Sequence, residues 1–210
     1  MYEPVDVITD EAGMRAIVPG TFPSQIAKIL NYVDDFCRIW IERSPFLTMA
    51  TVSASGRIDV SPKGDPPGFV KVLDRNTLAI PDRPGNHRYD SFLNIFETGR
   101  IGLCFFVLNR NEVVRVNGSA RVVRDQSLRE GMAVSGKVPD FAVLVRVEEA
   151  FYHCGKAVLR SKLWAPEEAV SVAGLPTYGA AVKAHAKDQR SVEELEQLMR
   201  RNEEMRLYDE

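Results

Sequence analysis

The feature that most constrains the fold is a series of short strand-forming runs joined by tight turns. Phe46 to Val52 is rich in β-formers, and Ser53-Ala54-Ser55-Gly56 is typical of a hairpin turn into the next run. The expected strands cover residues 46–52, 57–61, 69–73, 77–81, 101–108, 112–123 and 141–152. Many short strands at regular spacing predict a closed or nearly closed antiparallel barrel, a mainly β fold with α additions (α+β), and disfavour a parallel doubly wound sheet.

Helical patterns lie before, between and after these strands. From Pro23 to Arg43 apolar residues recur at helical spacing, which predicts one amphipathic helix that stops before Ser44-Pro45. Further helices are expected at 89–97, ending at Gly99, at 126–134, and from the capping box Ser191-Val192-Glu193-Glu194 to about 205. We expect an N-terminal arm over 1–22, a barrel domain over 23–165 and a helical extension over 166–210.

Composition excludes several classes of protein. The chain of 210 residues carries 27 basic and 29 acidic residues, and this net charge of −2 predicts no general affinity for nucleic acid or membrane. No apolar run approaches the roughly 20 residues that span a bilayer, and the acidic start lacks the features of a secretion signal. Cys37, Cys104 and Cys154 are odd in number and widely spaced, as expected for reduced thiols. The expected location is cytoplasmic.

A first polar cluster follows the first hairpin turn, in the segment Arg57 to Gly64. Ser61 and Lys63 lie two apart, so both side chains leave the same face of an extended strand. A hydroxyl beside an ammonium is a suitable pair for a phosphate oxygen. The alternative, a solvated strand face, is the commoner meaning of such a pair taken alone.

A second cluster runs from Ile80 to Ser91 and combines a strand end, a Pro-Gly loop and a helix start. Backbone N–H groups at a helix N-terminus favour an anion, and Arg83 and Arg88 can add charge-assisted hydrogen bonds. The combination suits a terminal phosphate. The alternative is a surface loop whose arginines pair with Asp82 and Asp90.

A third cluster follows the last expected strand, between Tyr152 and Trp164. On one helix Lys156, Arg160 and Leu163-Trp164 would share a face, which could grip a flat anionic ligand or a partner subunit; a plain amphipathic cap on the barrel is equally natural. His153-Cys154 has no second pair of ligands at a suitable spacing, so no metal site is expected. The sequence also contains no phosphate-loop, dinucleotide or nucleophile-elbow motif, and it identifies no catalytic residue.

Taken in order, these clusters resemble the pyridoxamine 5′-phosphate oxidase-related FMN-binding proteins, and among them a bacterial subgroup of FMN-dependent enzymes. The resemblance covers about residues 20–165 and is carried by the segments 59–64, 80–88, 112–118 and 156–164. It implies a six-stranded antiparallel split β-barrel that forms a homodimer with FMN in the clefts between subunits.

The resemblance also implies roles for residues of the three clusters. Ser61 and Lys63 would contact the flavin or its phosphate, and the 81–88 segment would hold ribityl and phosphate groups. The segment from Lys156 to Trp164 would close the site from the other subunit. The cofactor-binding residues expected on this basis are Ser61, Lys63, Pro81, Asp82, Arg83, Asn86, His87, Arg88, Lys156, Arg160, Ser161 and Trp164.

The function that the resemblance implies is an FMN-dependent oxidoreductase acting on a small-molecule substrate, with NAD(P)H as a candidate electron donor. Two alternatives stay open: a non-catalytic FMN-binding or flavin-sequestering protein, and an F420- or haem-binding member of the same fold. The turn Asn109-Arg110-Asn111 departs from the apolar or Pro/Gly-containing turn of close relatives. The C-terminal substrate signature of true pyridoxamine phosphate oxidases is not evident, so vitamin B6 oxidation is not expected.

Overall fold

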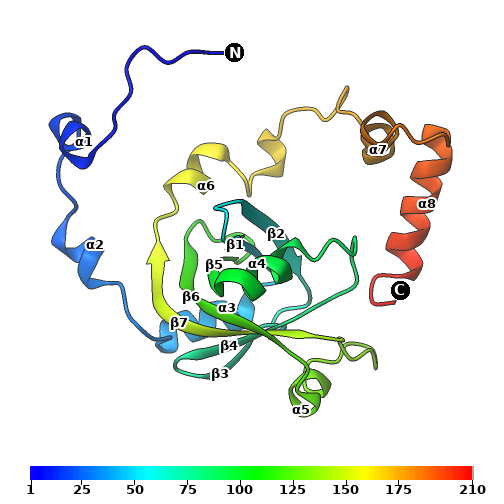
Figure 1. Ribbon diagram of the computed structural model, residues 1–210, viewed down its shortest axis with the longest axis horizontal. Helices are drawn as coiled ribbons and strands as arrows, with labels where there is room; N and C mark the ends of the chain where they lie inside the picture. The colour runs from blue at the N-terminus through cyan, green and yellow to red at the C-terminus, as the bar shows by residue number, and fades with distance from the viewer. Residues whose placement is uncertain (210) are drawn as a thin grey trace.

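The computed structural model describes residues 1–209 and consists of one antiparallel sheet with helices around it (Figure 1). The strands are β1 (Phe46–Val52), β2 (Ile58–Gly64), β3 (Lys71–Asp74), β4 (Thr77–Pro81), β5 (Arg100–Phe106), β6 (Val113–Val123) and β7 (Ala142–His153). The helices are α1 (Glu11–Ile17), α2 (Pro23–Ala27), α3 (Asp35–Arg43), α4 (Asp90–Thr98), α5 (Gln126–Glu130), α6 (Lys156–Ser161), α7 (Tyr178–Ala186) and α8 (Val192–Met205), with a 3₁₀ turn η1 at Pro166–Glu168.

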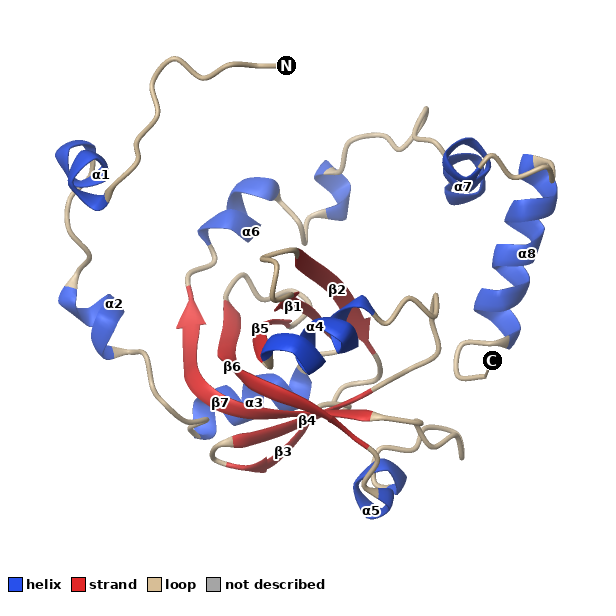
Figure 2. Ribbon diagram, in the orientation of Figure 1, coloured by secondary structure: helices blue, strands red, loops and turns tan. Residues whose placement is uncertain are grey.

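The sheet order is β2-β1-β5-β6-β7-β4-β3, and every neighbouring pair is antiparallel. The long strands β6 and β7 bend strongly and carry the sheet around its core (Figure 2), with β2 and β3 as its two edges. The expected mainly β, antiparallel split-barrel class is confirmed. The sheet has seven strands rather than the six that the resemblance implies, and they correspond to the seven strand-forming runs of the sequence.

The core forms because apolar residues alternate along each strand and point to the inside of the curved sheet. On β1 the buried residues are Leu47, Met49 and Thr51, and the side chains between them are half-buried. The same alternation supplies Ile101, Leu103 and Phe105 from β5, Val114 and Val116 from β6, and Val143, Val145 and Val147 from β7. This period-two pattern is why all the strands were predictable, most of them to within two residues at each end.

The predicted single helix over residues 23–43 is wrong, because the chain leaves the helical path between α2 and α3. Leu30 adds a bridge to the edge of the barrel, donating to and accepting from the backbone of Ala150 at 3.1 and 2.8 Å. Asp34 then caps α3 by accepting the Cys37 backbone N–H at 2.8 Å. An N-cap aspartate starts a new helix and satisfies donors that a continuous helix would not expose.

Helix α4 is the element that positions the polar loop before it. Its buried face includes Phe92 and Ile95, and the buried Asn94 amide donates to the Thr51 hydroxyl of β1 at 3.0 Å. Gly99 ends the helix in the left-handed region at φ 64°, as the sequence predicts. Buried polar contacts of this kind are costly to lose, so α4 is fixed against β1.

The two ends of the chain lie outside the barrel (Figure 1). Residues 1–22, expected as an irregular arm, include α1, whose seven residues are all exposed. At the other end α7 packs on α8, with Glu196 accepting the Gly179 backbone N–H at 2.8 Å. The predicted capping box of α8 is confirmed, with the Ser191 and Glu194 groups bonded reciprocally. None of the helices within residues 1–209 has the length and apolar character needed to cross a membrane.

Gly118 provides a test of the sheet geometry. It sits at the register shift between β6 and β7, where a Cβ would clash with the Arg146 carbonyl oxygen. We expect Gly118→Ala to lower the free energy of unfolding by about 1–3 kcal/mol, measured by urea denaturation, because the overpacked backbone must shift. Gly20→Ala is the matched control, since a Cβ there has no neighbour within 4 Å among the described residues. Equal stability of the two variants would contradict this geometry.

Candidate functional site

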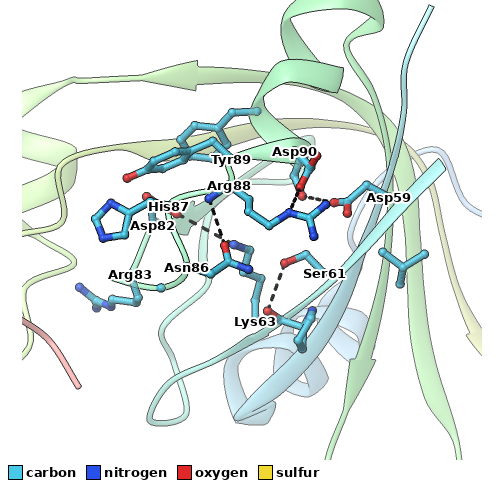
Figure 3. Close-up of a pocket in the computed structure, with 15 residues that line it drawn as sticks. Asp59, Ser61, Lys63, Asp82, Arg83, Asn86, His87, Arg88, Tyr89 and Asp90 are labelled. Carbon is cyan, nitrogen blue, oxygen red and sulfur yellow. Dashed lines mark hydrogen bonds and ion pairs between the residues drawn. The ribbon is translucent and has the colours of Figure 1, made fainter. Parts of the chain in front are cut away.

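The principal pocket lies between strand β2 and the loop that joins β4 to α4 (Figure 3). It has a volume of about 280 Å³. Asp59 to Lys63 of β2 all line it, and burial alternates along the strand, with Asp59, Ser61 and Lys63 half-buried, so the predicted shared face of Ser61 and Lys63 is present. This row of side chains meets the loop opposite, because residues of both segments line the same pocket.

The loop opposite, residues 82–89, carries two non-glycine residues in the left-handed region. His87 has φ 56° and Tyr89 has φ 53°, one on each side of Arg88. Such conformations cost on the order of 1–3 kcal/mol each and persist only where the surroundings hold them. Tyr89 is also the N-cap of α4, and its own side chain makes no capping hydrogen bond there. Asp90, Ser91 and Phe92, in the first turn of α4, line the pocket.

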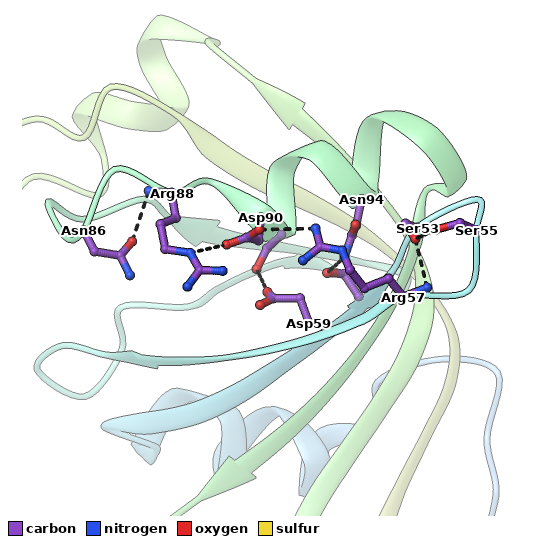
Figure 4. Close-up of polar contacts among 10 residues, drawn as sticks. Ser53, Ser55, Arg57, Asp59, Asn86, Arg88, Asp90 and Asn94 are labelled. Atoms are coloured by element: carbon purple, nitrogen blue, oxygen red, sulfur yellow. Dashed lines mark hydrogen bonds and ion pairs between the residues drawn. The ribbon is translucent and has the colours of Figure 1, made fainter. Parts of the chain in front are cut away.

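An exposed ionic chain connects this loop to the first hairpin (Figure 4). Arg88 Nε donates to Asp90 Oδ2 at 2.7 Å, and Arg57 Nη2 donates to Asp90 Oδ1 at 3.2 Å. The hydrogen bond from Arg88 is the largest cause that lowers the pKa of Asp90, and the same bond raises the pKa of Arg88. The alternative expected for Arg88, pairing with Asp90, is therefore present.

Two further contacts hold the polar side chains around the pocket. The Arg88 backbone N–H donates to the Asn86 amide oxygen at 3.1 Å. The Ser91 hydroxyl donates to Asp59 Oδ2 at 2.6 Å, joining α4 to β2. By contrast, Lys63 Nζ lies 4.0 Å from Asp82 Oδ1, a loose ion pair. Among the lysine and arginine side chains of the pocket, Lys63 has the longest ion-pair distance, so its ammonium group can turn to a ligand most readily.

Arg83 has a different environment from Arg88. Its Nε donates to Asp65 Oδ2 at 2.6 Å and its Nη2 donates to the Met132 carbonyl at 2.8 Å. The Asp65 side chain is only 1% exposed and the Arg83 side chain 14%. In Figure 3 Arg83 points away from Ser61 and Arg88. Arg83 borders the pocket but holds the loop to its neighbours, and it pairs with Asp65 rather than the anticipated Asp82.

The predicted residues divide into two groups in space. Ser61, Lys63, Asp82, Arg83, Asn86, His87 and Arg88 all line the principal pocket, and Pro81 lines a continuous pocket of about 290 Å³ beside it. The other group, Lys156, Arg160, Ser161 and Trp164, belongs to α6 and the residues after it. Within the described residues, this group lines neither of these two pockets.

The segment after β7 also differs from the predicted helix. Helix α6 ends at Ser161, and Lys162 follows in the left-handed region at φ 52°, so Leu163 and Trp164 do not continue the face of Lys156 and Arg160. Trp164 Nε1 instead donates to the Arg110 carbonyl at 2.7 Å. Trp164 is therefore tied to the unusual turn at residues 109–111 by this hydrogen bond.

Several residues of the site lie outside the predicted set. Asp59, Tyr89, Asp90 and Ser91 all line the pocket. Asp59 could have been found from the sequence, because it lies two residues before Ser61 on the same strand face. Asp65 and Met132 have no sequence signal, since each meets Arg83 only through the fold.

Two of the three cysteines are poorly suited to act as nucleophiles. Burial is the largest cause that raises the pKa of the Cys37 thiol, to about 12, and burial also raises the pKa of Cys104. Both thiols therefore stay protonated near neutral pH. Within residues 1–209, no three His, Cys, Asp or Glu side chains are grouped as a metal site would require.

The donor set at the pocket fits the phosphate of a nucleotide cofactor. Ser61, Lys63, Asn86 and Arg88 supply a hydroxyl, an ammonium, an amide and a guanidinium around one opening. A phosphate monoester carries about 1.5 to 2 negative charges at neutral pH and is bound best by charged donors of this kind. The apolar slot that a flavin ring also needs is not provided by these polar residues.

The sequence of this chain matches one family of known proteins. The sequence profile described as Pyridoxamine 5′-phosphate oxidase matches residues 33–154. No curated protein matches the chain as a sequence relative.

Three solved structures are similar in fold. A putative pyridoxamine 5′-phosphate oxidase from Lactobacillus delbrueckii is 24% identical with a TM-score of 0.46, covering 58% of this chain and 95% of that one. An FMN-binding protein from Syntrophomonas wolfei is 11% identical with a TM-score of 0.41, covering 55% of this chain and 86% of that one. HutZ, the haem storage protein of Vibrio cholerae, is 12% identical with a TM-score of 0.41, covering 58% and 93%.

The two arginines of the loop should differ sharply in their effect on stability. Removing Arg83 leaves the buried Asp65 carboxylate without its ionic partner, so Arg83→Ala should lower the free energy of unfolding by about 3–5 kcal/mol. Arg88 pairs at the exposed surface, where ion pairs contribute little, so Arg88→Ala should leave stability nearly unchanged. Urea denaturation of both variants measures the difference, and a similar loss for the two would contradict a structural role for Arg83.

Proposed function

This chain belongs to the pyridoxamine 5′-phosphate oxidase family, and on that premise we propose that it is an FMN-dependent oxidoreductase. The observation that carries the proposal is the convergence of Ser61 and Lys63 on β2 with Asn86 and Arg88 on the opposite loop. These residues come from two segments of the matched region and converge on one pocket. We propose that they bind the FMN phosphate.

Each proposed ligand-binding residue has a physical reason for its role. Lys63 is held by a loose 4.0 Å pair and can turn to an incoming anion. Arg88 uses only Nε on Asp90, which leaves its Nη donors for a phosphate oxygen. Asn86 accepts the Arg88 backbone N–H through its oxygen, so its amide nitrogen is directed elsewhere as a donor. Arg83 keeps the loop in place rather than binding the phosphate directly.

FMN, when bound, supplies the redox chemistry by accepting and donating electrons as a hydride, and the protein supplies binding and orientation. Ser61, Lys63, Asn86 and Arg88 would hold the phosphate end of the cofactor at the principal pocket. A substrate or NAD(P)H would have to approach the flavin ring for electron transfer. Asp59 and Asp90 keep the surroundings of the phosphate from becoming uniformly cationic.

We further propose that the site is completed in a homodimer. Lys156, Arg160, Ser161 and Trp164 lie away from the pocket of their own subunit, so their expected cofactor role requires a second copy. Ile58 and Val60, on the outward side of β2, are 70% and 61% exposed. An exposed apolar edge beside a polar pocket is suited to a partner subunit and to the apolar part of a ligand. Sedimentation as a monomer at micromolar concentration with FMN present would contradict the dimer.

The visible spectrum of the purified protein is the first test of the cofactor. A flavin spectrum, with FMN released by heat, would support the proposal, and F420 or haem would give a different spectrum. Turnover of NAD(P)H by the yellow protein would then distinguish an enzyme from a flavin-sequestering protein. A colourless protein that takes up no added FMN would refute the proposed cofactor.

Arg88 and Arg190 allow a matched test of the phosphate site. Both form exposed ion pairs with an aspartate two residues away, Arg88 with Asp90 and Arg190 with Asp188, but only Arg88 lines the pocket. Arg88→Gln should raise the Kd for FMN about tenfold, the effect expected for one charge-assisted hydrogen bond. Arg190→Gln should leave the Kd unchanged, and flavin fluorescence quenching measures both. Equal Kd values for the two variants would remove Arg88 from the phosphate site.

A further inference from the structure

A second pocket of about 370 Å³ lies beside the first, between the 82–89 loop, residues 136–140 and the end of the described chain. Asp82, Arg83 and Tyr89 line both pockets, so the two share one wall. The opposite wall of the second pocket includes Tyr208 and Asp209. These two residues follow α8 and are more than 100 positions from the loop in sequence, the Tyr208–Asp65 separation being 143. The last described residues, after α8, therefore lie next to the candidate site.

We propose that Tyr208 is a positioning residue that latches the 82–89 loop in its ligand-binding conformation through the buried Asp65–Arg83 pair. Tyr208 Oη donates to Asp65 Oδ1 at 2.6 Å, while Arg83 Nε donates to Asp65 Oδ2 at 2.6 Å. One carboxylate therefore joins the loop on one side to residue 208 on the other. The latch concerns the conformation of the loop alone, whereas its effect on the affinity for FMN rests on the proposed function.

Because Asp65 is buried, losing its hydrogen bond from Tyr208 would be energetically costly. The carboxylate side chain is only 1% exposed, so water has little access to replace a lost donor. A buried carboxylate oxygen that loses its hydrogen-bond donor destabilises the folded state, because its lost hydration is no longer compensated. The hydrogen bond to Asp65 is also the largest cause that raises the pKa of Tyr208, so the phenol remains a donor at neutral pH.

Further contacts place Tyr208 against the loop. The Arg83 guanidinium carbon lies 5.5 Å from the centre of the Tyr208 ring, within the range of a cation–π interaction. Next to it, Asp209 pairs with Lys137 at 2.6 Å, although that pair is about half exposed and contributes little alone. Arg83 is thus enclosed by Asp65, the Met132 carbonyl and the Tyr208 ring.

The consequence for the loop follows from its backbone strain. His87 and Tyr89 are held in the left-handed region, and such residues relax when their surroundings loosen. Arg83 is the point where the loop is tied to the rest of the chain by a buried ion pair. Loss of the Tyr208 donor should therefore loosen the loop, and with it Asn86 and Arg88, without changing any residue that lines the principal pocket.

Hydrogen exchange of the cofactor-free protein tests the latch, with Tyr208→Phe as the variant because it removes only the hydroxyl. We expect exchange of amides in residues 82–89 to become about tenfold faster, as the loss of a hydrogen bond to a charged group predicts, and exchange in β5 and β6 to stay unchanged. Tyr178→Phe is the matched control, since Tyr178 is 71% exposed on α7. Unchanged exchange over 82–89 in Tyr208→Phe would overturn the proposal.

The Kd for FMN, measured by fluorescence quenching, separates this inference from the proposed function. A several-fold weaker Kd for Tyr208→Phe but not for Tyr178→Phe would support the positioning role. Faster exchange over 82–89 with an unchanged Kd would overturn that role and leave only a structural contact. If wild-type protein binds no FMN while exchange responds as expected, the latch stands and the proposed cofactor fails.

Discussion

The Asp65 carboxylate is the group on which the arrangement of the candidate site depends. It is buried, and both of its oxygens accept hydrogen bonds, one from Arg83 and one from Tyr208. A buried charge is tolerated only when it is paired and its hydrogen-bonding capacity is used. The loop after β4 and the segment after α8 are therefore drawn to one point just beyond the end of β2. The position of that loop fixes Asn86 and Arg88 opposite Ser61 and Lys63.

Local patterns made the strands and the first half of the site predictable. Strand alternation depends on nearest neighbours in the sequence, so the shared face of Ser61 and Lys63 follows from their spacing alone. The same is true of Gly99 and Ser191, whose backbone and side-chain chemistry marks helix ends. What these signals have in common is that each is complete within a few residues of the chain.

The errors arose where a distant partner competes with a local pattern. The apolar spacing over 23–43 is helical, yet Leu30 pairs with Ala150 of β7, and that pairing breaks the helix. Arg83 and Arg88 look alike in the sequence, but only Arg83 meets a buried carboxylate, which lies 18 residues away. No spacing rule distinguishes the two arginines, because their difference is created by tertiary contacts.

The division of the predicted cofactor residues between two places leads to one last step. The pocket at β2 is rich in charged and polar donors, which suits a phosphate but not an isoalloxazine ring. The chain's other candidates lie on and after α6, where Trp164 is anchored to the turn at Arg110 and Leu159 and Leu163 are 58% and 53% exposed. Exposed apolar residues beside Lys156 and Arg160 would enlarge the small apolar part of the pocket, which Val60, Pro62 and Phe92 line. In a symmetric dimer, the α6 segment of each copy would reach the pocket of the other copy, since a twofold axis repeats every contact. Under the proposed function, dimerisation is then a requirement of the binding chemistry rather than an addition to it.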